Sequence, residues 1–234
     1  ASFAEARIQP EHASIREDTV ETLRYSRRDH RVLALLGVKF GWGLAGGVLV
    51  VIPLLAHETF DAGDVGLGLL MAARGIGALV GPFVGRAMLG PQDRRIFLAI
   101  SVSLATFGVG YVLVGLAPTL LLVMALVAFA HLGGGATWTM SSYGLQRIVP
   151  DRIRGRIFAF DGMLVTLSFG ISSILTGVLA DVSAPETAAI VMGSVALVWA
   201  LAWTWLTSDV RRATMLEGCG PAPEPELVAP EPRT

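Results

Sequence analysis

The chain has 234 residues, of which 53% are hydrophobic and only 16% are charged, and its formal net charge is −1. A soluble globular domain has about 45–50% apolar and about 25% charged residues, so this composition excludes an ordinary soluble domain. The apolar residues come in long blocks, as they do when lipid is the solvent. Cys219 is the single cysteine, which excludes an internal disulfide.

The N-terminal segment, residues 1–31, is polar and carries six arginines. Ser14 and Glu17 fit a capping box, and Val20 and Leu23 follow at helical spacing. We expect residues 1–31 to form a cytoplasmic linker with a short helix that lies on the membrane surface. A solvated linker without that helix is the alternative interpretation.

Six apolar stretches follow, and each has about 20 residues or more, which is enough to cross ~30 Å of hydrocarbon as a helix. A continuous apolar run does not show the alternation of a membrane β-barrel strand. The sequence therefore predicts an all-α membrane protein with a transmembrane domain over residues 32–207. The predicted spans are Val32–Ala56, Val65–Leu89, Ile96–Ala117, Thr119–Leu145, Ile157–Ala180 and Thr187–Leu206.

Arginine is distributed unevenly among the connections. His57–Asp64, Pro118 and Asp181–Glu186 contain no Lys or Arg. The other connections and the C-terminal segment carry Arg86, Arg94, Arg95, Arg147, Arg152, Arg154, Arg156, Arg211 and Arg212. This bias predicts that both termini lie in the cytoplasm. Five prolines fall within residues 217–234, and we expect residues 208–234 to be a disordered cytoplasmic tail.

Glycines interrupt the first and fourth spans near mid-membrane, at Gly41, Gly43, Gly46 and Gly47 and at 133–135. If the six helices form two inverted three-helix repeats, these two spans are equivalent. Broken helices at equivalent positions of inverted repeats indicate the binding site of a transporter. The glycines of the second span, Gly77, Gly81 and Gly85, are interpreted as helix packing positions.

Five polar and aromatic residues inside the spans are candidates to line a substrate cavity. They are Lys39, Trp42, Arg74, His131 and Trp138. A charge at the bilayer centre costs about 3 kcal/mol on insertion scales, so Arg74 should face a cavity or an acidic partner. A structural ion pair remains the alternative for Arg74. Packing remains the alternative for His131 and for both tryptophans, because a single histidine in a helix is more often a hydrogen-bonded packing residue.

Asp161 lies near the cytoplasmic end of the fifth span, at a depth similar to that of Lys39. The two side chains can pair, or each can reach toward the interface separately. Its depth makes Asp161 a weak candidate for proton coupling. Trp199, Trp203 and Trp205, near the end of the sixth span, are interpreted as interfacial anchors.

Several classes of protein are disfavoured by missing motifs. The sequence has no phosphate loop, no Gly-x-Ser-Gly beside the intramembrane histidine and no Cys/His cluster. We therefore expect neither an enzyme nor a cofactor nor a metal site. The arginine clusters are explained by membrane topology, so no nucleic-acid partner is expected.

Three stretches carry a family resemblance over about Val20 to Arg212. They are Val20–Tyr25 with Arg27-Arg28, then Arg74–Leu79 with Gly81-Pro82, and Leu145–Asp151 with Arg154-Gly155-Arg156. The chain resembles the C-terminal half of a major facilitator superfamily transporter, and it is most similar to bacterial twelve-helix efflux members of the enterobactin-exporter type. Members of that superfamily usually carry an Asp four residues after a loop Gly, where this chain has Leu89, and Asp93 is a candidate substitute.

The resemblance implies a secondary active transporter, or its C-terminal half, that exports a small organic solute by alternating access in the bacterial inner membrane. Protons are the coupling ion that it implies. A gate at the cytoplasmic loops would use Arg86, Asp93, Arg94, Arg95, Arg154, Arg156 and Asp161. Because members have twelve helices, a second six-helix half is an expected partner, either a missing N-terminal half or a second copy. The alternative function is a non-transporting six-helix membrane anchor or regulatory subunit that binds a partner protein.

Overall fold

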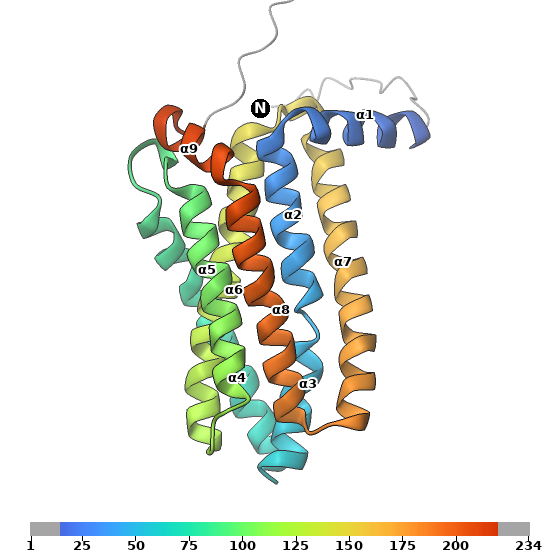
Figure 1. Ribbon diagram of the computed structural model, residues 1–234, viewed down its shortest axis with the longest axis vertical. Helices are drawn as coiled ribbons and strands as arrows, with labels where there is room; N and C mark the ends of the chain where they lie inside the picture. The colour runs from blue at the N-terminus through green and yellow to red at the C-terminus, as the bar shows by residue number, and fades with distance from the viewer. Residues whose placement is uncertain (1–14, 220–234) are drawn as a thin grey trace, which may run out of the picture.

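The computed structural model describes residues 15–219, and Figure 1 shows a bundle of long helices with one short helix, α1, across one end. Ser14, which would cap α1, lies outside the described residues. The helices are α1 (Ile15–Arg28), α2 (His30–Leu44), α3 (Val48–Leu54), the π-helical turn η1 (Leu55–Thr59), α4 (Gly63–Met88), the 3-10 turn η2 (Pro91–Asp93), α5 (Ile96–Val114), α6 (Leu120–Ile148), α7 (Asp151–Val182), α8 (Pro185–Leu206) and α9 (Ser208–Glu217).

Six segments are long and apolar enough to cross a membrane, which confirms the predicted number of spans. The first is His30–Thr59, made of α2, α3 and η1, and the others are α4 to α8. The fifth span begins at Asp151 rather than at the predicted Ile157. Pro150 precedes the helix and Asp151 lies in its first turn, so favourable N-terminal residues extend the helix beyond its apolar part.

The helix pairings are those of two inverted three-helix repeats. The first repeat is the α2–α3 span with α4 and α5, and the second is α6 with α7 and α8. In this arrangement the α2–α3 span is equivalent to α6, α4 to α7 and α5 to α8. Accordingly, α2 packs on α7, and its equivalent α6 packs on α4. In the same way α2 and α3 pack on α8, and α6 packs on α5. α5 and α8, the third helices of the two repeats, pack on each other. The fold class predicted from the sequence is therefore confirmed.

The first span is interrupted between α2 and α3, as its glycines predicted. Ala45, Gly46 and Val48 donate their N–H groups three residues back, so the helix tightens there instead of continuing. Ser172 of α7 supplies the missing partners: its Oγ accepts from Gly47 N at 2.8 Å and donates to Leu44 O at 2.6 Å. A broken helix is tolerated at membrane depth only when a neighbouring group satisfies its backbone in this way.

The corresponding prediction for the fourth span is wrong, because α6 runs unbroken from Leu120 to Ile148. Its glycines instead allow close packing on two sides. A Cβ atom on Gly133 would lie 2.3 Å from Ser103 O of α5, and one on Gly135 would lie 2.5 Å from Ala78 O of α4. Small residues at such contacts let helices approach each other closely.

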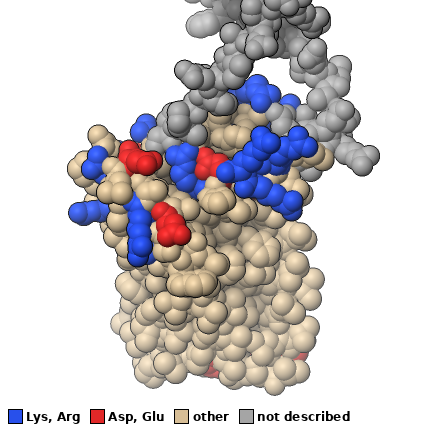
Figure 2. All heavy atoms as spheres, turned by 45° about the horizontal axis from the view of Figure 1, so that its top comes forward, with Lys and Arg blue, Asp and Glu red and all other residues tan. Residues whose placement is uncertain are grey.

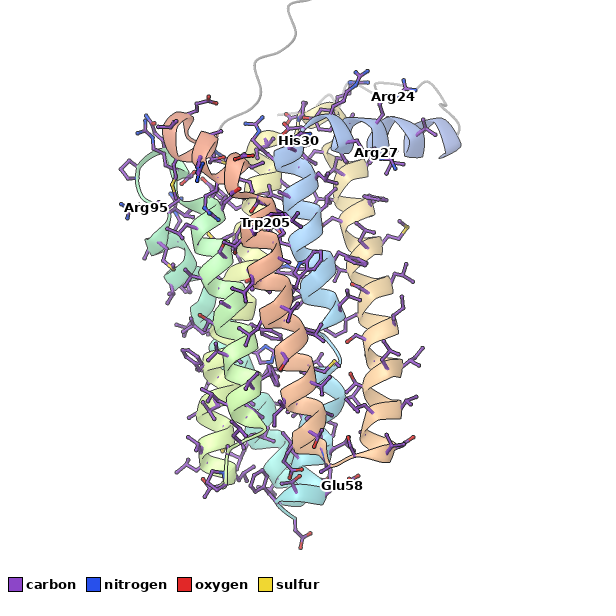
Figure 3. All side chains as sticks on the ribbon, in the orientation of Figure 1. Arg24, Arg27, His30, Glu58, Arg95 and Trp205 are labelled. Atoms are coloured by element: carbon purple, nitrogen blue, oxygen red, sulfur yellow. The ribbon has the colours of Figure 1, made fainter. Side chains whose placement is uncertain are left out.

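The tryptophans of α8 do not share one role. Trp203 is 2% exposed, and its Nε1 donates to Ala34 O of α2 at 2.8 Å, so the prediction of an interfacial anchor is wrong for this residue. Trp205 is 75% exposed and points outward from the bundle in Figure 3. Two residues of separation place these two side chains on different faces of one helix.

The C-terminal segment is helical at its start, which corrects the predicted disorder for residues 208–217. α9 begins directly after Thr207, whose Oγ1 donates to Trp203 O at 2.7 Å. Ser208 and Asp209 in the first turn suit a helix N-terminus. Residues 220–234 of the predicted tail lie outside the described residues.

Lys and Arg gather at the end of the bundle that carries α1 and α9, and Figure 2 shows these charges around that end with tan surface below. We call it the basic end. In Figure 3 the labelled Arg24, Arg27, His30 and Arg95 lie there, while Glu58 lies at the opposite end.

Candidate functional site

A buried ion pair joins the first and fifth spans. Lys39 Nζ of α2 contacts the Oδ2 atom of Asp161 of α7, and the two side chains are 2% and 5% exposed. Lys39 Nζ also donates to Ser142 Oγ at 2.9 Å and lies 4.8 Å from the ring centre of Trp138. Asp161 was predicted near the cytoplasmic end of the fifth span and among the gate residues, and it lies inside the bundle as the partner of Lys39, the pairing that its depth allowed. Its Oδ1 atom is buried and has no hydrogen-bond partner among the described residues.

An aromatic row continues from this pair. The ring of Trp138 lies 5.7 Å from that of Trp42, and Trp42 lies 5.9 Å from Phe107 and 5.7 Å from Phe169. Trp138 is 44% exposed, whereas Phe107 is 1% exposed, so the row is open at Trp138 and closed at Phe107. The Nε1 atom of Trp42 is buried and makes no hydrogen bond within the described part of the chain. The row therefore offers an apolar wall with one unsatisfied donor.

His131 and Arg74 lie at the far end of the row. The His131 ring contacts Phe107 edge-on at 5.6 Å, and its Nε2 shares a hydrogen bond of 2.9 Å with the hydroxyl of Tyr111.

Arg74 lies on α4 about one turn before Gly77, where an added Cβ atom would lie 2.1 Å from Ala128 O and 3.0 Å from Leu132 N of α6, on either side of His131 in the sequence. Arg74 is half-buried, and its Nε atom is buried without a partner among the described residues.

Four of the five residues predicted for the substrate cavity are brought into one continuous set of contacts, which runs from Lys39 through Trp138 and Trp42, then by way of Phe107 to His131. The fifth, Arg74, lies beyond the His131 end on α4 and, in the described part of the chain, makes no hydrogen bond, ion pair or ring contact with the other four. We call the five residues and Phe107 the Lys39–Arg74 row. Its role in binding a solute remains a prediction. Phe107, Tyr111 and Ser142 were not predicted, because a single aromatic residue or serine in a span carries no signal of its neighbours.

The helices beside the row, α4 and α7, leave much of their length uncovered. Phe83 of α4 is 71% exposed and Ile174 of α7 is 70% exposed. A Cβ atom added to Gly75, Gly162 or Gly170 on the same two helices would meet no atom within 4 Å, so nothing in the described chain packs on them. These two helices present a large apolar surface, which lipid or another protein segment must cover.

A second polar cluster lies at the basic end and is centred on Asp93, whose side chain is 9% exposed. Its Oδ1 accepts from Arg86 at 2.8 Å, and its Oδ2 accepts from the Tyr143 hydroxyl at 2.6 Å. Arg147 Nε lies 3.8 Å from the same Oδ2. Asp93 adopts a positive φ of 55°, which turns its carboxylate inward from the α4–α5 connection. We call these four residues the Asp93 network.

The other predicted gate residues lie outside this network. Arg94 binds the exposed Gln92 Oε1 at 2.7 Å, and Arg95 is exposed. Arg154 Nη2 donates to Val149 O at 3.0 Å and pairs with Asp151, so it closes the α6–α7 turn. Arg156 is half-buried on α7. Tyr143 and Arg147 were not predicted as partners of Asp93, since 50 or more residues separate them from it in the chain.

The C-terminal segment touches the same region. Cys219 donates its backbone N–H to Gln92 O at 3.1 Å, and its carbonyl accepts from Arg147 Nε at 3.3 Å. Burial raises the pKa of the Cys219 thiol to about 11. The end of α9 is therefore held against the α4–α5 connection and α6.

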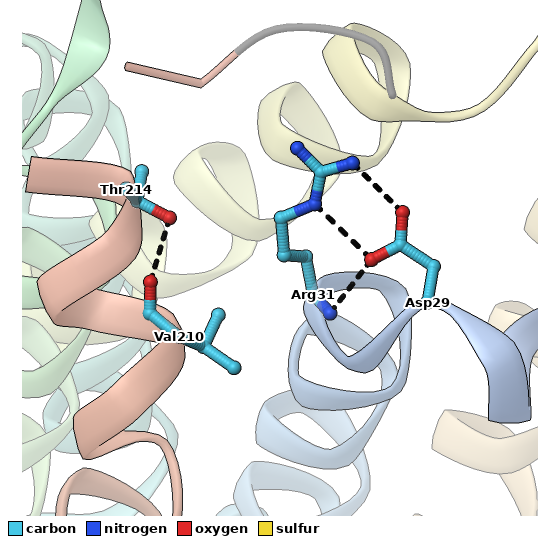
Figure 4. A network of polar contacts seen from close by, with 4 residues as sticks. All are labelled: Asp29, Arg31, Val210 and Thr214. Atoms are coloured by element: carbon cyan, nitrogen blue, oxygen red, sulfur yellow. Dashed lines mark hydrogen bonds and ion pairs between the residues drawn. The ribbon is translucent and has the colours of Figure 1, made fainter. Parts of the chain in front are cut away.

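Asp29 fixes the start of α2, because its carboxylate accepts hydrogen bonds from Arg31 N at 2.9 Å and from the Arg31 guanidinium (Figure 4). The same figure shows Val210 and Thr214 of α9 near this contact. Burial alone would raise the pKa of Asp29, but hydrogen bonding and charge from Arg31 outweigh it and hold that pKa below its ordinary value. The contact orders the start of the first span.

An open, shallow cavity of about 740 Å³ lies at the basic end. Its lining includes Tyr143, Arg147, Arg154 and Phe158. The ring centre of Phe158 lies 5.9 Å from Lys39 Nζ. Phe158 therefore belongs to the cavity lining and also lies beside the ion pair. Within the described residues, no group of three His, Cys, Asp or Glu could hold a metal ion.

Comparison with known proteins is consistent with this architecture. The sequence profile of the Major Facilitator Superfamily matches residues 14–232, which is nearly the whole chain. No significant match was found among curated proteins or among solved structures. Members of this superfamily are multi-pass membrane proteins that transport small molecules and are not enzymes. With six apolar helices in inverted repeats and a family match over nearly all of its length, the chain belongs to the Major Facilitator Superfamily of membrane transporters.

Proposed function

We propose that this chain is a secondary active transporter, or the C-terminal half of one, that exports a small organic solute by alternating access. The observation that carries the proposal is the Lys39–Arg74 row, which has a buried cation paired with a buried carboxylate, a half-buried arginine and tryptophans of which Trp138 is 44% exposed. Intramembrane charges are costly, and they typically mark solute or ion pathways.

The basic end faces the cytoplasm in this proposal, with both termini on that side. The arginine bias between alternate connections supports this orientation. The resemblance to bacterial efflux members supports the inner membrane as the location. Outward movement of the solute would then begin at the cavity lined by Tyr143, Arg147 and Arg154.

A second six-helix unit would cover the row. The uncovered surfaces of α4 and α7 flank it, and glycines with free space above them recur on both helices. The second unit is either a further segment of a longer protein or a second copy of this chain. A solute would be bound between the two units and released when they rock about it.

The Asp93 network would act as the cytoplasmic gate. It ties α4, the α4–α5 connection and α6 together with one buried carboxylate and two arginines. Opening the basic end would require these contacts to separate. Their strength therefore helps to set the equilibrium between the conformation open to the cytoplasm and the conformation open to the other side.

Protons are the coupling ion in this proposal, and Asp161 is the candidate carboxylate. The sequence made it a weak candidate by depth, but the structure buries it within the bundle. Its unpartnered Oδ1 is an available position for a proton, and the neighbouring Lys39 would lose its charge partner when that proton binds. Loading of a proton would thereby loosen the contact between α2 and α7.

The experiment uses a bacterial strain that lacks its own efflux pumps and expresses the full-length protein. Accumulation of a library of radiolabelled organic solutes is compared with that in cells carrying Lys39→Ala or Asp161→Ala. We expect at least one solute to accumulate less with the native protein, and each variant to abolish the difference at an equal amount of protein in the membrane. If no solute accumulates differently, the alternative of a non-transporting anchor or regulatory subunit is favoured.

A further inference from the structure

A groove runs along the bundle between α2 and α8, which lie side by side in Figure 1 and pack on each other. Trp203 of α8 forms part of its floor, because its indole N–H donates to Ala34 O of α2. About one turn away, Trp199 lies so close to α2 that a Cβ atom on Gly41 would be 1.9 Å from its Nε1. One cavity lies between these helices at membrane depth, and another lies beside their ends at the basic end.

The cavity at membrane depth is apolar. It has a volume of about 420 Å³, and its lining includes Gly41, Leu44 and Trp199. Ser194 also lines it, but the hydroxyl of this residue donates to Ile190 O of the same helix at 2.7 Å. The unpartnered Nε1 of Trp199 is buried over Gly41. The cavity therefore suits a hydrocarbon chain.

Exposed apolar positions continue the groove toward the basic end. On α2, His30, Leu33, Gly37 and Gly41 follow one another at intervals of three or four residues, so they share one face of the helix. Leu33 is 49% exposed, and a Cβ atom added to Gly37 would meet no atom within 4 Å. Val198, which lines the apolar cavity from α8, is 67% exposed. Nothing in the described chain fills the groove between the two cavities at Gly37.

The groove has the length of one membrane leaflet. From His30 to Leu44, α2 rises by roughly 21 Å at the rise of an α-helix. A bilayer with its head-group regions is about 40–45 Å thick, so one leaflet takes about 20–22 Å. Leu44 lies directly before the break near mid-membrane. The groove therefore extends from head-group level at His30 to the middle of the membrane.

The second cavity lies at head-group level and has a volume of about 690 Å³. Tyr25, Arg28 and His30 line it from the α1–α2 corner, and Asp209 and Val210 line it from the start of α9. Arg28 and His30 are exposed, so both are accessible to a head group.

Positive charge predominates around this second cavity. Residues 22–31 and 208–213 carry six arginines and two aspartates, an excess of four positive charges. One of the aspartates, Asp29, is already paired with Arg31. The other, Asp209, is exposed on the α9 side, opposite Arg28 and the exposed Arg27 of α1. The charge at this end of the groove complements an anion.

We propose that the groove between α2 and α8 binds an anionic phospholipid, with its phosphate beside Arg28 and one acyl chain in the cavity between Gly41 and Trp199. Basic cavities between membrane helices bind anionic head groups in this way. Lys39 lies on the opposite face of α2, because the nine residues from His30 make about two and a half turns. The lipid is therefore a ligand separate from any solute at the Lys39–Arg74 row, and its binding does not depend on transport.

The test titrates the full-length protein in detergent with phosphatidylglycerol and with phosphatidylcholine of identical acyl chains, and native mass spectrometry gives the dissociation constant of the first bound lipid. We expect phosphatidylglycerol to bind at least tenfold more tightly. Arg28→Gln should lower this preference about fivefold, because the loss of one arginine beside the phosphate weakens the anionic lipid alone. Gly37→Leu should fill the groove and weaken both lipids about tenfold without changing their ratio.

Each variant has a matched control. Arg95→Gln removes an exposed arginine of the basic end that lies on the α4–α5 connection, away from α1 in Figure 3, and should leave the preference unchanged. Gly170→Leu adds the same side chain to open space on α7 and should leave both dissociation constants unchanged.

Equal binding of the two lipids to the native protein overturns the proposal. So does a preference that keeps its full size in Arg28→Gln, a result that is independent of Gly37→Leu because Arg28 is exposed. Equal effects of Gly37→Leu and Gly170→Leu would place the lipid elsewhere on the bundle and contradict the assigned groove.

Discussion

Lys39 and Asp161 lie 122 residues apart in the chain and form a buried ion pair between α2 and α7, the first and fifth spans. The pair connects the helix that is broken near mid-membrane with the helix whose Ser172 repairs the break. The charge site and the irregular backbone are therefore held by the same two helices. Movement of α2 against α7 would alter both.

Removing one partner of the pair should destabilise the protein more than removing both. Asp161→Leu leaves the Lys39 charge buried alone, and such a loss costs about 3–5 kcal/mol in the free energy of unfolding. The double variant Lys39→Met with Asp161→Leu should recover most of that loss, because no charge stays uncompensated. Thermal unfolding in detergent measures both variants. A double variant that is less stable than Asp161→Leu would contradict a coupled pair.

A glycine of α4 sets the distance between α4 and α6. A Cβ atom on Gly81 would lie 2.3 Å from Leu132 O, whereas one on Gly75 of the same helix meets no atom within 4 Å. Gly81→Ala should therefore push the helices apart and lower the stability by about 1–3 kcal/mol.

Gly75→Ala is the control for Gly81→Ala, and it should leave the stability unchanged or raise it by up to about 1 kcal/mol, because alanine favours the helix. The melting temperatures of the two variants compare them directly. Equal effects of the two substitutions would show that α4 does not pack on α6 as described.

The hydroxyl of Ser172 should matter more than an ordinary helix serine. Ser172→Ala leaves Gly47 N–H and Leu44 O without a partner at the break, and each unsatisfied buried group costs about 1–3 kcal/mol. Ser194→Ala is the control, since its hydroxyl bonds only Ile190 O of its own helix. Hydrogen exchange at Gly47 should accelerate in the first variant alone. Unchanged exchange there would contradict the role assigned to Ser172.

The Cys219 thiol should react slowly in the folded protein. With its pKa raised from 9.0 to about 11, the thiolate fraction at pH 8 is about 100-fold smaller than that of an unperturbed thiol. Iodoacetamide alkylation should accelerate about tenfold for each pH unit up to pH 11. A rate that levels off near pH 9 would contradict the buried position of the thiol.

The same shift in the pKa of Cys219 links stability to pH. The folded state binds the proton more tightly than the unfolded state does. The resulting contribution of Cys219 to the free energy of unfolding is fully present below pH 9 and is lost as the pH rises through about 11.

The spans and their number could be predicted from the sequence because lipid imposes a length and a composition on every crossing segment. The depth of Lys39 and Asp161 also allowed their pairing to be considered. The contacts of Asp93 with Tyr143 and Arg147 could not be found, since they depend on the approach of the α4–α5 connection to α6.

Two errors have related physical causes. Glycine is compatible both with a break and with a close contact, so the sequence alone could not separate the broken first span from the continuous α6. A tryptophan near a helix end can lie at the interface or against a neighbouring helix. Trp203 does the latter because Ala34 O offers its indole N–H a partner.

The transport mechanism is tested most directly by asking whether a reagent can reach the Lys39–Asp161 pair from both sides of the membrane. Ser142→Cys, introduced with Cys219→Ser, puts the only thiol beside Lys39 Nζ, and a membrane-impermeant maleimide is added to right-side-out and to inside-out vesicles. We expect labelling from both sides, and Asp93→Asn should raise the rate from the basic end several-fold while lowering the rate from the other side. Labelling from one side only, unaffected by Asp93→Asn, would contradict alternating access at the Lys39–Arg74 row.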